Sequence, residues 1–196
     1  MTAVKLEAPV FAARLRRMYG VARNLPDRLL HGRRHLAVRR QLAGLSRPRT
    51  ILVVCYGNVC RSPYLEAVLQ RALHDVRVTS AGFLRAGRRV PESFLSASAE
   101  RGIDLSGFRS RPLEPRKVRD IDLVVAMDPF QANHLMRYLR VPSERIIVAG
   151  DLDPVPGSTR AIQDPFQQPV DVLLSTLERL DRCAATLVAT VSSRRS

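Results

Sequence analysis

A cysteine and an arginine, with five residues between them, lie in a segment whose residue types could transfer a phosphate group. The segment, residues 55–63, reads Cys-Tyr-Gly-Asn-Val-Cys-Arg-Ser-Pro. The thiolate is the nucleophilic form of cysteine. The planar guanidinium of arginine can hold two oxygens of one phosphate group, which lysine cannot do. Cys55 and Arg61 therefore predict a site for covalent phosphoryl transfer through sulfur.

The residues on either side predict a strand, a loop and a helix. Residues 50–54, Thr-Ile-Leu-Val-Val, are mostly apolar and β-branched, as is typical of a buried strand. Ser62 has the residue type of a helix N-cap, and Pro63 suits the first helical position. A loop that leads into a helix N-terminus offers free N–H groups and the positive end of the helix dipole to an anion. We expect this arrangement to stabilise the thiolate of Cys55.

In this setting the segment resembles the signature of the low-molecular-weight protein tyrosine phosphatases, and the resemblance extends over about residues 50–191. Members of that family carry a general acid in a late Asp-Pro-aromatic segment, which is Asp164-Pro165-Phe166 in this chain. The resemblance implies that Asp164 protonates the leaving oxygen and later activates the water that hydrolyses the cysteinyl-phosphate. Asp128 and Asp153 also precede prolines, and we interpret both as structural.

The other loop residues are expected to support the phosphate site. Ser62 can donate its hydroxyl to the sulfur, which favours the thiolate. Gly57 and Asn58 tolerate the left-handed backbone that such a loop can need. The resemblance implies that Asn58 forms hydrogen bonds with neighbouring polar groups, one of which matches Ser80. The residues expected to bind phosphate or to support the loop are Tyr56, Gly57, Asn58, Val59, Cys60, Ser62 and Ser80.

The sequence departs from the family pattern in a stretch that usually contains a histidine. This stretch, residues 105–111, reads Leu-Ser-Gly-Phe-Arg-Ser-Arg. Phe108 stands where the histidine is expected, and its ring cannot donate or accept a conventional hydrogen bond. We therefore expect part of the network that supports the loop to be rebuilt or lost.

Phosphotyrosine is the predicted substrate group. In the family, residues after Ser-x-Gly and the aromatic residue after Asp-Pro flank the substrate, which points here to Phe83, Leu84 and Phe166. A flat apolar slot suits the tyrosine ring. Val59 also favours phosphotyrosine, because the pattern of the arginine phosphatases in this superfamily has threonine at that position. The resemblance also suggests a phosphotyrosine-bearing protein, such as a tyrosine kinase, as the partner.

Three alternatives to a tyrosine phosphatase remain open. The first is a protein arginine phosphatase. The second is a thiol-dependent arsenate reductase, which would need two further cysteines close together downstream, whereas Cys183 stands alone there. The third is a non-catalytic adaptor that binds phosphate groups, against which the presence of Cys55, Arg61 and Asp164 argues.

The cysteine and histidine pattern predicts no disulfide framework, no metal and no cofactor. The chain has three cysteines, and we expect no secretory signal. Cys60 either packs beneath the loop or forms a reversible bridge with Cys55 that protects the nucleophile from over-oxidation. Cys183 falls on the apolar stripe of the last helix and is expected in the core. The four histidines are scattered, without zinc spacing.

The positive charge is concentrated at the N-terminus. The 196 residues carry a net charge of +14; residues 1–49 hold 12 Lys or Arg against 2 Asp or Glu, and residues 50–196 hold 20 against 16. We expect a basic, Arg-rich and partly helical extension over residues 1–49, a linker at residues 46–49, and a catalytic domain over residues 50–196. The apolar runs are too short to span a bilayer, so we expect a cytoplasmic protein.

The extension contains apolar residues at helical spacing, flanked by arginines. A basic amphipathic helix of this kind could lie on an anionic membrane surface or bind an acidic partner. It also resembles an organelle transit segment, and it could instead pack on the catalytic domain. Few aromatic residues accompany the charge, which disfavours nucleic-acid binding. The apolar series is Leu29, Leu36, Val38, Leu42 and Leu45, and the arginines are Arg28, Arg33, Arg34, Arg39 and Arg40.

The catalytic part alternates between predicted strands and helices. Beyond residues 50–54, strands are expected near residues 76–80, 121–127 and 145–149, and helices over 63–74, 91–101, 129–140 and 170–191. Such alternation indicates one α/β domain in which helices cover both faces of a four-stranded parallel sheet. The active site is expected at the carboxyl ends of the strands. The resemblance adds a flavodoxin-like strand order.

Overall fold

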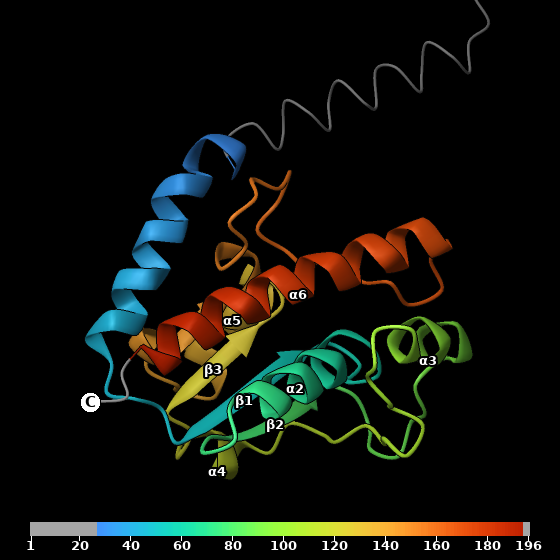
Figure 1. The fold of residues 1–196 in the computed structure, drawn as a ribbon. Coiled ribbons are helices and arrows are strands. Elements are labelled where there is room, and N and C mark those ends of the chain that lie inside the picture. The colour runs from blue at the N-terminus through green and yellow to red at the C-terminus, as the bar shows by residue number, and fades with distance from the viewer. Residues whose placement is uncertain (1–26, 194–196) are drawn as a thin grey trace, which may run out of the picture.

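The computed structural model describes residues 27–193, so the first 26 residues of the predicted basic extension lie outside the described range. A parallel sheet of four strands forms the centre of the molecule (Figure 1). Its order is β2-β1-β3-β4, as expected for a flavodoxin-like fold. The strands are β1 (Thr50–Cys55), β2 (Arg77–Gly82), β3 (Leu123–Ala126) and β4 (Ile146–Val148).

Helices cover both faces of the sheet because both faces of its central strands are apolar. Along β1, Ile51 and Val53 belong to one buried cluster, whereas Leu52 and Val54 belong to another. The first cluster packs against α2 (Arg61–Ala72), α3 (Glu92–Ala99) and α6 (Val170–Ser192). The second packs against α4 (Pro115–Val118), which was not predicted, and α5 (Pro129–Tyr138). Short 3-10 turns, η1 (Ser143–Arg145) and η2 (Ala149–Asp151), flank β4.

The long helix α6 supplies one side of the larger cluster. Its apolar residues recur at helical spacing and form one buried stripe, as the sequence predicts. Burial of each large apolar side chain of this kind contributes about 1.5–3 kcal/mol relative to exposure. Cys183 lies in this stripe and is fully buried, which confirms its predicted place in the core. The other residues of the stripe include Leu173, Leu177, Leu180, Ala184, Leu187 and Val191.

Residues 27–44 form a helix, blue in Figure 1, that packs on the catalytic domain. A hydrogen bond from Gln41 to the carbonyl of Ile146 places it beside the edge strand β4. Val38 and Leu42 are buried in the larger cluster, whereas Leu29 and Leu36 are exposed to 73% and 55%. The expectation of one apolar series is therefore wrong. The spacing of these leucines and Val38 places them on two opposite sides of the helix, because each residue turns the direction by about 100°.

The side chain of Gln41 fixes this helix further, because its amide donates to the backbone carbonyls of Glu144 and Ile146, both at 2.9 Å. Residues 46–49 then lead, without helix or strand, into β1, as predicted for the linker. Within residues 27–193, no helix combines the length and the hydropathy needed to cross a bilayer.

Candidate active site

The loop after β1 folds back on the sulfur of Cys55. The backbone N–H of Asn58 donates to Cys55 Sγ at 3.2 Å, and the Ser62 hydroxyl donates at 3.0 Å. Asn58 has a φ of 50°, the left-handed conformation that was expected for it. Gly57 does not share that conformation, so this part of the expectation is wrong. The backbone of Gly57 instead lies close to the guanidinium of Arg88, where a Cβ atom would approach Nη1 to 2.8 Å.

Helix α2 begins at Arg61, two residues earlier than the Ser-Pro pair suggested. Its N-cap residue is Cys60, which makes no capping hydrogen bond with its side chain. The prediction of Ser62 as N-cap is wrong, because Ser62 lies inside the first turn and its hydroxyl is used by the sulfur. Pro63 is the third helical residue, where its missing N–H costs little because the first four N–H groups have no partner inside the helix.

Asn58 connects the loop to β2, as the resemblance implied. Its side-chain amide donates to the hydroxyls of Ser62 at 2.9 Å and Ser80 at 2.8 Å. Ser80 in turn donates to the carboxylate of Glu66 at 2.5 Å. Asn58, Ser62 and Ser80 are all buried, and Asn58 is fully so. A buried amide with its partners satisfied holds the loop in one conformation.

The network is rebuilt where the expected histidine is missing. The side-chain oxygen of Asn58 accepts a hydrogen bond from the backbone N–H of Arg111 at 2.7 Å. The guanidinium of Arg111 pairs with the Glu66 carboxylate and lies 4.9 Å from the centre of the Phe108 ring. Phe108 therefore supports the network through a cation–π contact rather than a hydrogen bond. Glu66 was missed in the sequence, although it follows Ser62 by one helical turn.

Arg61 and Asp164 meet above the loop. Arg61 is 4% exposed; it donates from Nη1 to the carbonyl of Ile162 at 2.9 Å and from Nη2 to the carboxylate of Asp164 at 2.5 Å. Within the described residues, Arg61 Nε is buried without a hydrogen-bond partner. The side chain of Asp164 is 46% exposed. The structure therefore brings together the three residues predicted to carry the chemistry, Cys55 at the floor and these two beside it.

A pocket of about 140 Å³ opens onto this group. Leu84 and Phe166 line it, as expected for residues that flank a substrate. Phe83 does not line it, which corrects the expectation, because its ring packs edge-on against His134 with centres 4.9 Å apart. Arg88 stands there instead, with its guanidinium 5.7 Å from the centre of the Phe166 ring. The lining also includes Cys55, Tyr56, Gly57, Val59, Cys60, Arg61 and Asp164.

The three cysteines differ in their surroundings. Burial, together with the nearby charges of Asp164 and Cys55, raises the pKa of the Cys60 thiol far above its usual range. Burial likewise raises the pKa of Cys183 to about 12. Both of these thiols therefore stay protonated and weakly nucleophilic. Cys55 differs from them because two donors, the backbone N–H of Asn58 and the hydroxyl of Ser62, face its sulfur.

The two rival Asp-Pro aspartates have structural contacts, which confirms their interpretation. Asp128 is the N-cap of α5 and accepts a hydrogen bond from the backbone N–H of Gln131 at 2.7 Å. Asp153 is buried and ion-paired to Arg179 and Arg182. Neither aspartate lines the pocket at Cys55.

Comparison with known families agrees with this geometry. The family described as low molecular weight phosphotyrosine protein phosphatase matches residues 50–196, three quarters of the chain. The chain belongs to this family. This low-molecular-weight phosphatase is 31% identical over 135 residues to a probable low molecular weight protein-tyrosine-phosphatase, EpsP, of Ralstonia nicotianae. The match covers 68% of this chain and 90% of the relative.

Solved structures agree on the fold of this phosphatase. The tyrosine phosphatase AmsI of Erwinia amylovora is similar, with a TM-score of 0.66, 26% identity, and coverage of 72% of this chain and 92% of that one. The YwlE arginine phosphatase of Geobacillus stearothermophilus also has a TM-score of 0.66, with 26% identity and coverage of 76% and 96%. The matched family region begins at residue 50, so the helix over residues 27–44 is an addition to the family domain.

Proposed function

We propose that this phosphatase hydrolyses phosphotyrosine in proteins through a cysteinyl-phosphate intermediate. The observation that carries the proposal is the surroundings of Cys55 Sγ, which accepts hydrogen bonds from Asn58 and Ser62 beneath a pocket that Arg61 and Asp164 line. Donors aimed at the sulfur favour the thiolate before attack and again when sulfur departs. No metal or cofactor is required for this chemistry.

In the first step, the thiolate of Cys55 attacks phosphorus, and the bond from phosphorus to the tyrosine oxygen breaks. Asp164 gives its proton to the departing phenolate. In the second step, Asp164 accepts a proton from water, which attacks the cysteinyl-phosphate. Inorganic phosphate leaves, and Cys55 returns to the thiolate.

Arg61 is proposed to exchange partners when the substrate arrives. Its Nη2 is paired with Asp164, and its buried Nε lacks a partner within the described residues. A phosphate group could take two parallel hydrogen bonds from these nitrogens, because the guanidinium edge matches two oxygens. That exchange would release Asp164 toward the leaving oxygen. Arg61 thus holds the carboxylate of Asp164 beside the pocket until the phosphate group displaces it, after which Asp164 can take up from solvent the proton that it delivers to the leaving oxygen.

The pocket walls support phosphotyrosine as the substrate group. Leu84 and Phe166 offer apolar surface to a ring. Val59 also lines the pocket and lacks a hydroxyl that could meet a guanidinium. The proposed partner is therefore a phosphotyrosine-bearing protein such as a tyrosine kinase.

Hydrolysis of p-nitrophenyl phosphate by the purified protein tests the catalytic assignment. Activity should vanish in Cys55→Ser and fall by about 10²–10⁴-fold in Asp164→Ala, the usual range for a general acid. Unchanged turnover in Cys55→Ser would refute the nucleophile. A phosphotyrosine peptide and a phosphoarginine peptide of the same sequence then test specificity, and preference for phosphoarginine would reject the proposed substrate.

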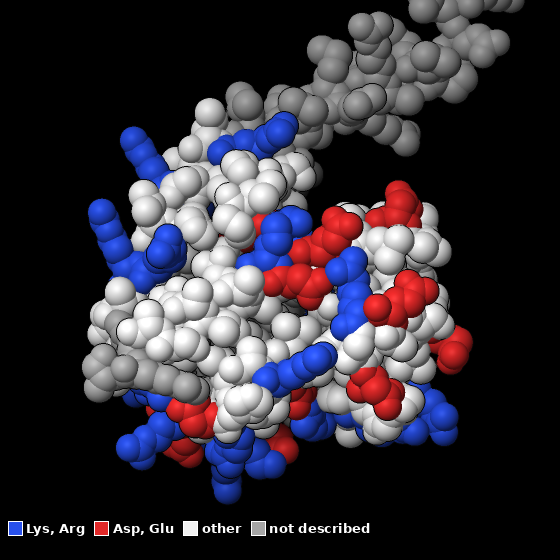
Figure 2. Space-filling model, viewed as in Figure 1, with Lys and Arg blue, Asp and Glu red and all other residues white. Residues whose placement is uncertain are grey.

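We also propose that the outward side of the helix over residues 27–44 binds anionic membrane surfaces. Its exposed apolar residues Leu29 and Leu36 lie on the side of the helix opposite the buried side. Figure 2 shows basic side chains that project from the surface over this helix. The exposed arginines are Arg28, Arg33, Arg39 and Arg40. Apolar insertion combined with basic charge is the pattern of helices that lie at a lipid interface.

Sedimentation of the full-length protein with vesicles tests the membrane proposal. We expect binding to anionic vesicles at low salt and none to neutral vesicles, because charge attraction is screened by salt. Leu29→Ser with Leu36→Ser should weaken it. The matched control is Phe130→Ser, a similarly exposed apolar residue on α5. Binding that is absent from anionic vesicles, or equal for both variants, would reject this surface.

A further inference from the structure

The segment that carries Asp164 is a long connection between β4 and α6, and a buried carboxylate anchors its first half. Asp153 is fully buried. Its oxygens accept hydrogen bonds from Arg182 Nε at 2.8 Å and Nη2 at 2.9 Å, from Arg179 Nε at 3.2 Å, and from the backbone N–H of Val155 at 3.1 Å. A buried charge with all these partners fixes the backbone on which it sits.

Arg179 links this anchor to the second half of the segment. Its Nη1 donates to the carbonyl of Ala161 at 2.8 Å, and its Nη2 donates to the carbonyl of Thr159 at 2.6 Å. Ala161 precedes Asp164 by three residues. The next carbonyl, that of Ile162, accepts from Arg61. A rigid connection therefore runs from Asp153 through Arg179 to the residues just before Asp164.

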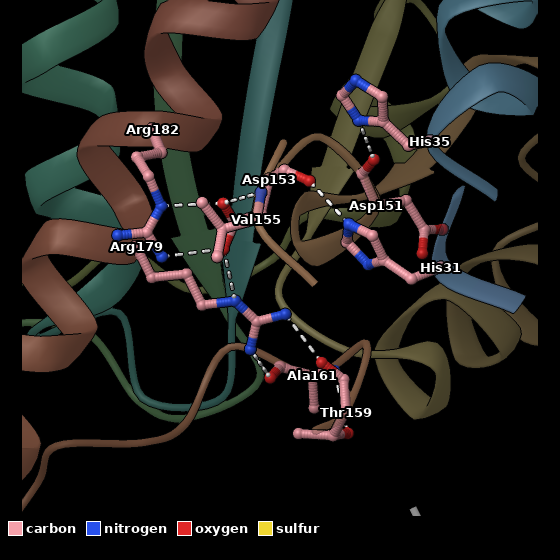
Figure 3. A network of polar contacts seen from close by, with 9 residues as sticks. All are labelled: His31, His35, Asp151, Asp153, Val155, Thr159, Ala161, Arg179 and Arg182. Carbon is pink, nitrogen blue, oxygen red and sulfur yellow. Dashed lines mark hydrogen bonds and ion pairs between the residues drawn. The ribbon is translucent and has the colours of Figure 1, made fainter. Parts of the chain in front are cut away.

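The helix over residues 27–44 holds the same anchor from the opposite side, as Figure 3 shows. His31 Nε2 lies 2.9 Å from the backbone oxygen of Asp153, and His35 Nδ1 lies 3.0 Å from that of Asp151. Because a carbonyl only accepts, each ring nitrogen must carry the proton at these positions. The two rings follow each other by one helical turn and lie 6.3 Å apart, nearly parallel.

The charges around the two histidines are already paired. The Asp151 carboxylate accepts from Arg160 Nε at 3.0 Å and Nη2 at 2.6 Å, and the Asp153 carboxylate is held by the two arginines of α6. The histidines thus contact backbone oxygens and do not neutralise these carboxylates. Their contribution is to fix where the backbone of residues 151–153 lies.

We propose that His31 and His35 are positioning residues for Asp164, so that the N-terminal helix sets the efficiency of proton transfer. This inference rests on the proposed role of Asp164 as general acid. The histidines fix the carbonyls of Asp151 and Asp153, and Arg179 transmits that position to the acid segment. The matched family region begins at residue 50, so this support is an addition of the present chain.

The test uses two substrates of the full-length protein that differ in their need for an acid. Phenolate leaves far less readily than p-nitrophenolate, so misplacement of Asp164 affects phenyl phosphate more. In His31→Ala with His35→Ala, kcat/KM for phenyl phosphate should fall about tenfold, part of the about 10²–10⁴-fold that a general acid supplies. The value for p-nitrophenyl phosphate should change much less. In an Asp164→Ala background, the same pair of changes should cause no further loss.

Three controls separate positioning from folding. His31→Gln keeps a donor for the Asp153 carbonyl and should restore most of the activity that His31→Ala loses. Arg33→Ala, on the exposed side of the same helix, should leave both substrates unaffected. If the double variant fails to fold, as judged by circular dichroism, His35→Ala alone carries the test.

The outcomes are distinguishable. Equal losses for both substrates, losses that add to those of Asp164→Ala, or no loss at all would overturn the positioning role. If Asp164→Ala itself leaves phenyl phosphate turnover unchanged, the proposed general acid fails, and this inference fails with it. A selective loss for phenyl phosphate that disappears without Asp164 supports it.

Discussion

The sulfur of Cys55 faces one backbone donor and one side-chain donor. The three residues proposed to carry the chemistry line one pocket. Cys55 and Arg61 were predictable from their residue types and the loop length, and Asp164 from the resemblance to the family. The role of Arg111 was not, because its backbone N–H reaches Asn58 across 53 positions in the sequence. Nothing in local spacing indicates such a contact. Local spacing also did not indicate that Arg88, and not Phe83, lines the pocket.

At the residue scale, Ser62→Ala should slow the step in which Cys55 leaves the phosphoenzyme. The hydroxyl donates to Cys55 Sγ at 3.0 Å, and a hydrogen bond to a charged group contributes about 1.5–3 kcal/mol. The expected loss in kcat is therefore about 10- to 100-fold. Stopped-flow measurement should show that the initial burst of product survives while steady turnover falls. Ser96→Ala, an exposed serine on α3, is the control. An unchanged kcat would contradict the assignment of this hydroxyl.

At the scale of the elements, the end of strand β2 must approach the loop after β1 closely. A Cβ atom on Gly82 would lie 2.8 Å from both the backbone nitrogen of Asn58 and the backbone oxygen of Tyr56. Strand β2 also connects to the loop through the backbone N–H of Phe83, which donates to the Tyr56 carbonyl at 2.9 Å. The strand itself was predictable from its pattern, but this backbone contact was not.

Gly82→Ala should therefore push the loop out of place. We expect the free energy of unfolding to fall by about 1–3 kcal/mol, the usual cost of overpacking, and activity toward p-nitrophenyl phosphate to fall more than the stability loss explains. Urea denaturation and steady-state kinetics measure the two effects. In Gly107→Ala, the added Cβ meets nothing within 4 Å, so neither the free energy of unfolding nor the activity should change. Equal behaviour of the two variants would show that the contact is unimportant.

The connection between β4 and α6 should make stability depend on pH. Burial alone would raise the pKa of Asp153, but hydrogen bonds from Arg182 and Val155 and the charges of Arg182 and Arg179 outweigh it and lower the pKa. Because the folded pKa lies below the unfolded value of about 3.9, the ionised group adds stability above that pH. This contribution is lost as the pH falls from there through the folded pKa.

Thermal unfolding as a function of pH measures this effect. As the pH falls below about 4, the Tm of the unaltered protein should decrease more steeply than the Tm of Asp153→Asn. The exposed Asp120→Asn should follow the unaltered protein. Parallel curves for all three proteins would contradict the role of Asp153 as an ionised anchor.

At the scale of the whole molecule, the packing of the N-terminal helix was the feature least predictable from the sequence. Charge and helical spacing predicted a helix, which residues 27–44 form. The prediction treats the apolar residues as one series, although their spacing divides them between two sides of the helix. Val38 and Leu42 pack into the core of the catalytic domain, whereas Leu29 and Leu36 remain exposed. Which side packs depends on the surface beside β4, and that surface exists only after the sheet has formed.

A matched pair on this helix tests the packing. Val38→Asp places a charge at a position that is 4% exposed, whereas Leu36→Asp places it at one that is 55% exposed. We expect Val38→Asp to destabilise by about 2 kcal/mol or more, a fall in Tm of about 4–8 °C for a chain of this size. Leu36→Asp should leave the Tm nearly unchanged. Similar Tm values for both would mean that the helix does not depend on this contact.

The central claim is that phosphate passes through the sulfur of Cys55. Rapid acid quenching of the reaction with p-nitrophenyl phosphate, followed by peptide mass spectrometry, tests it most directly. We expect a phosphate adduct on Cys55 that forms within the burst and disappears when substrate is exhausted. An adduct on Cys60 or another residue, or turnover without any adduct on the peptide that contains Cys55, would contradict the claim.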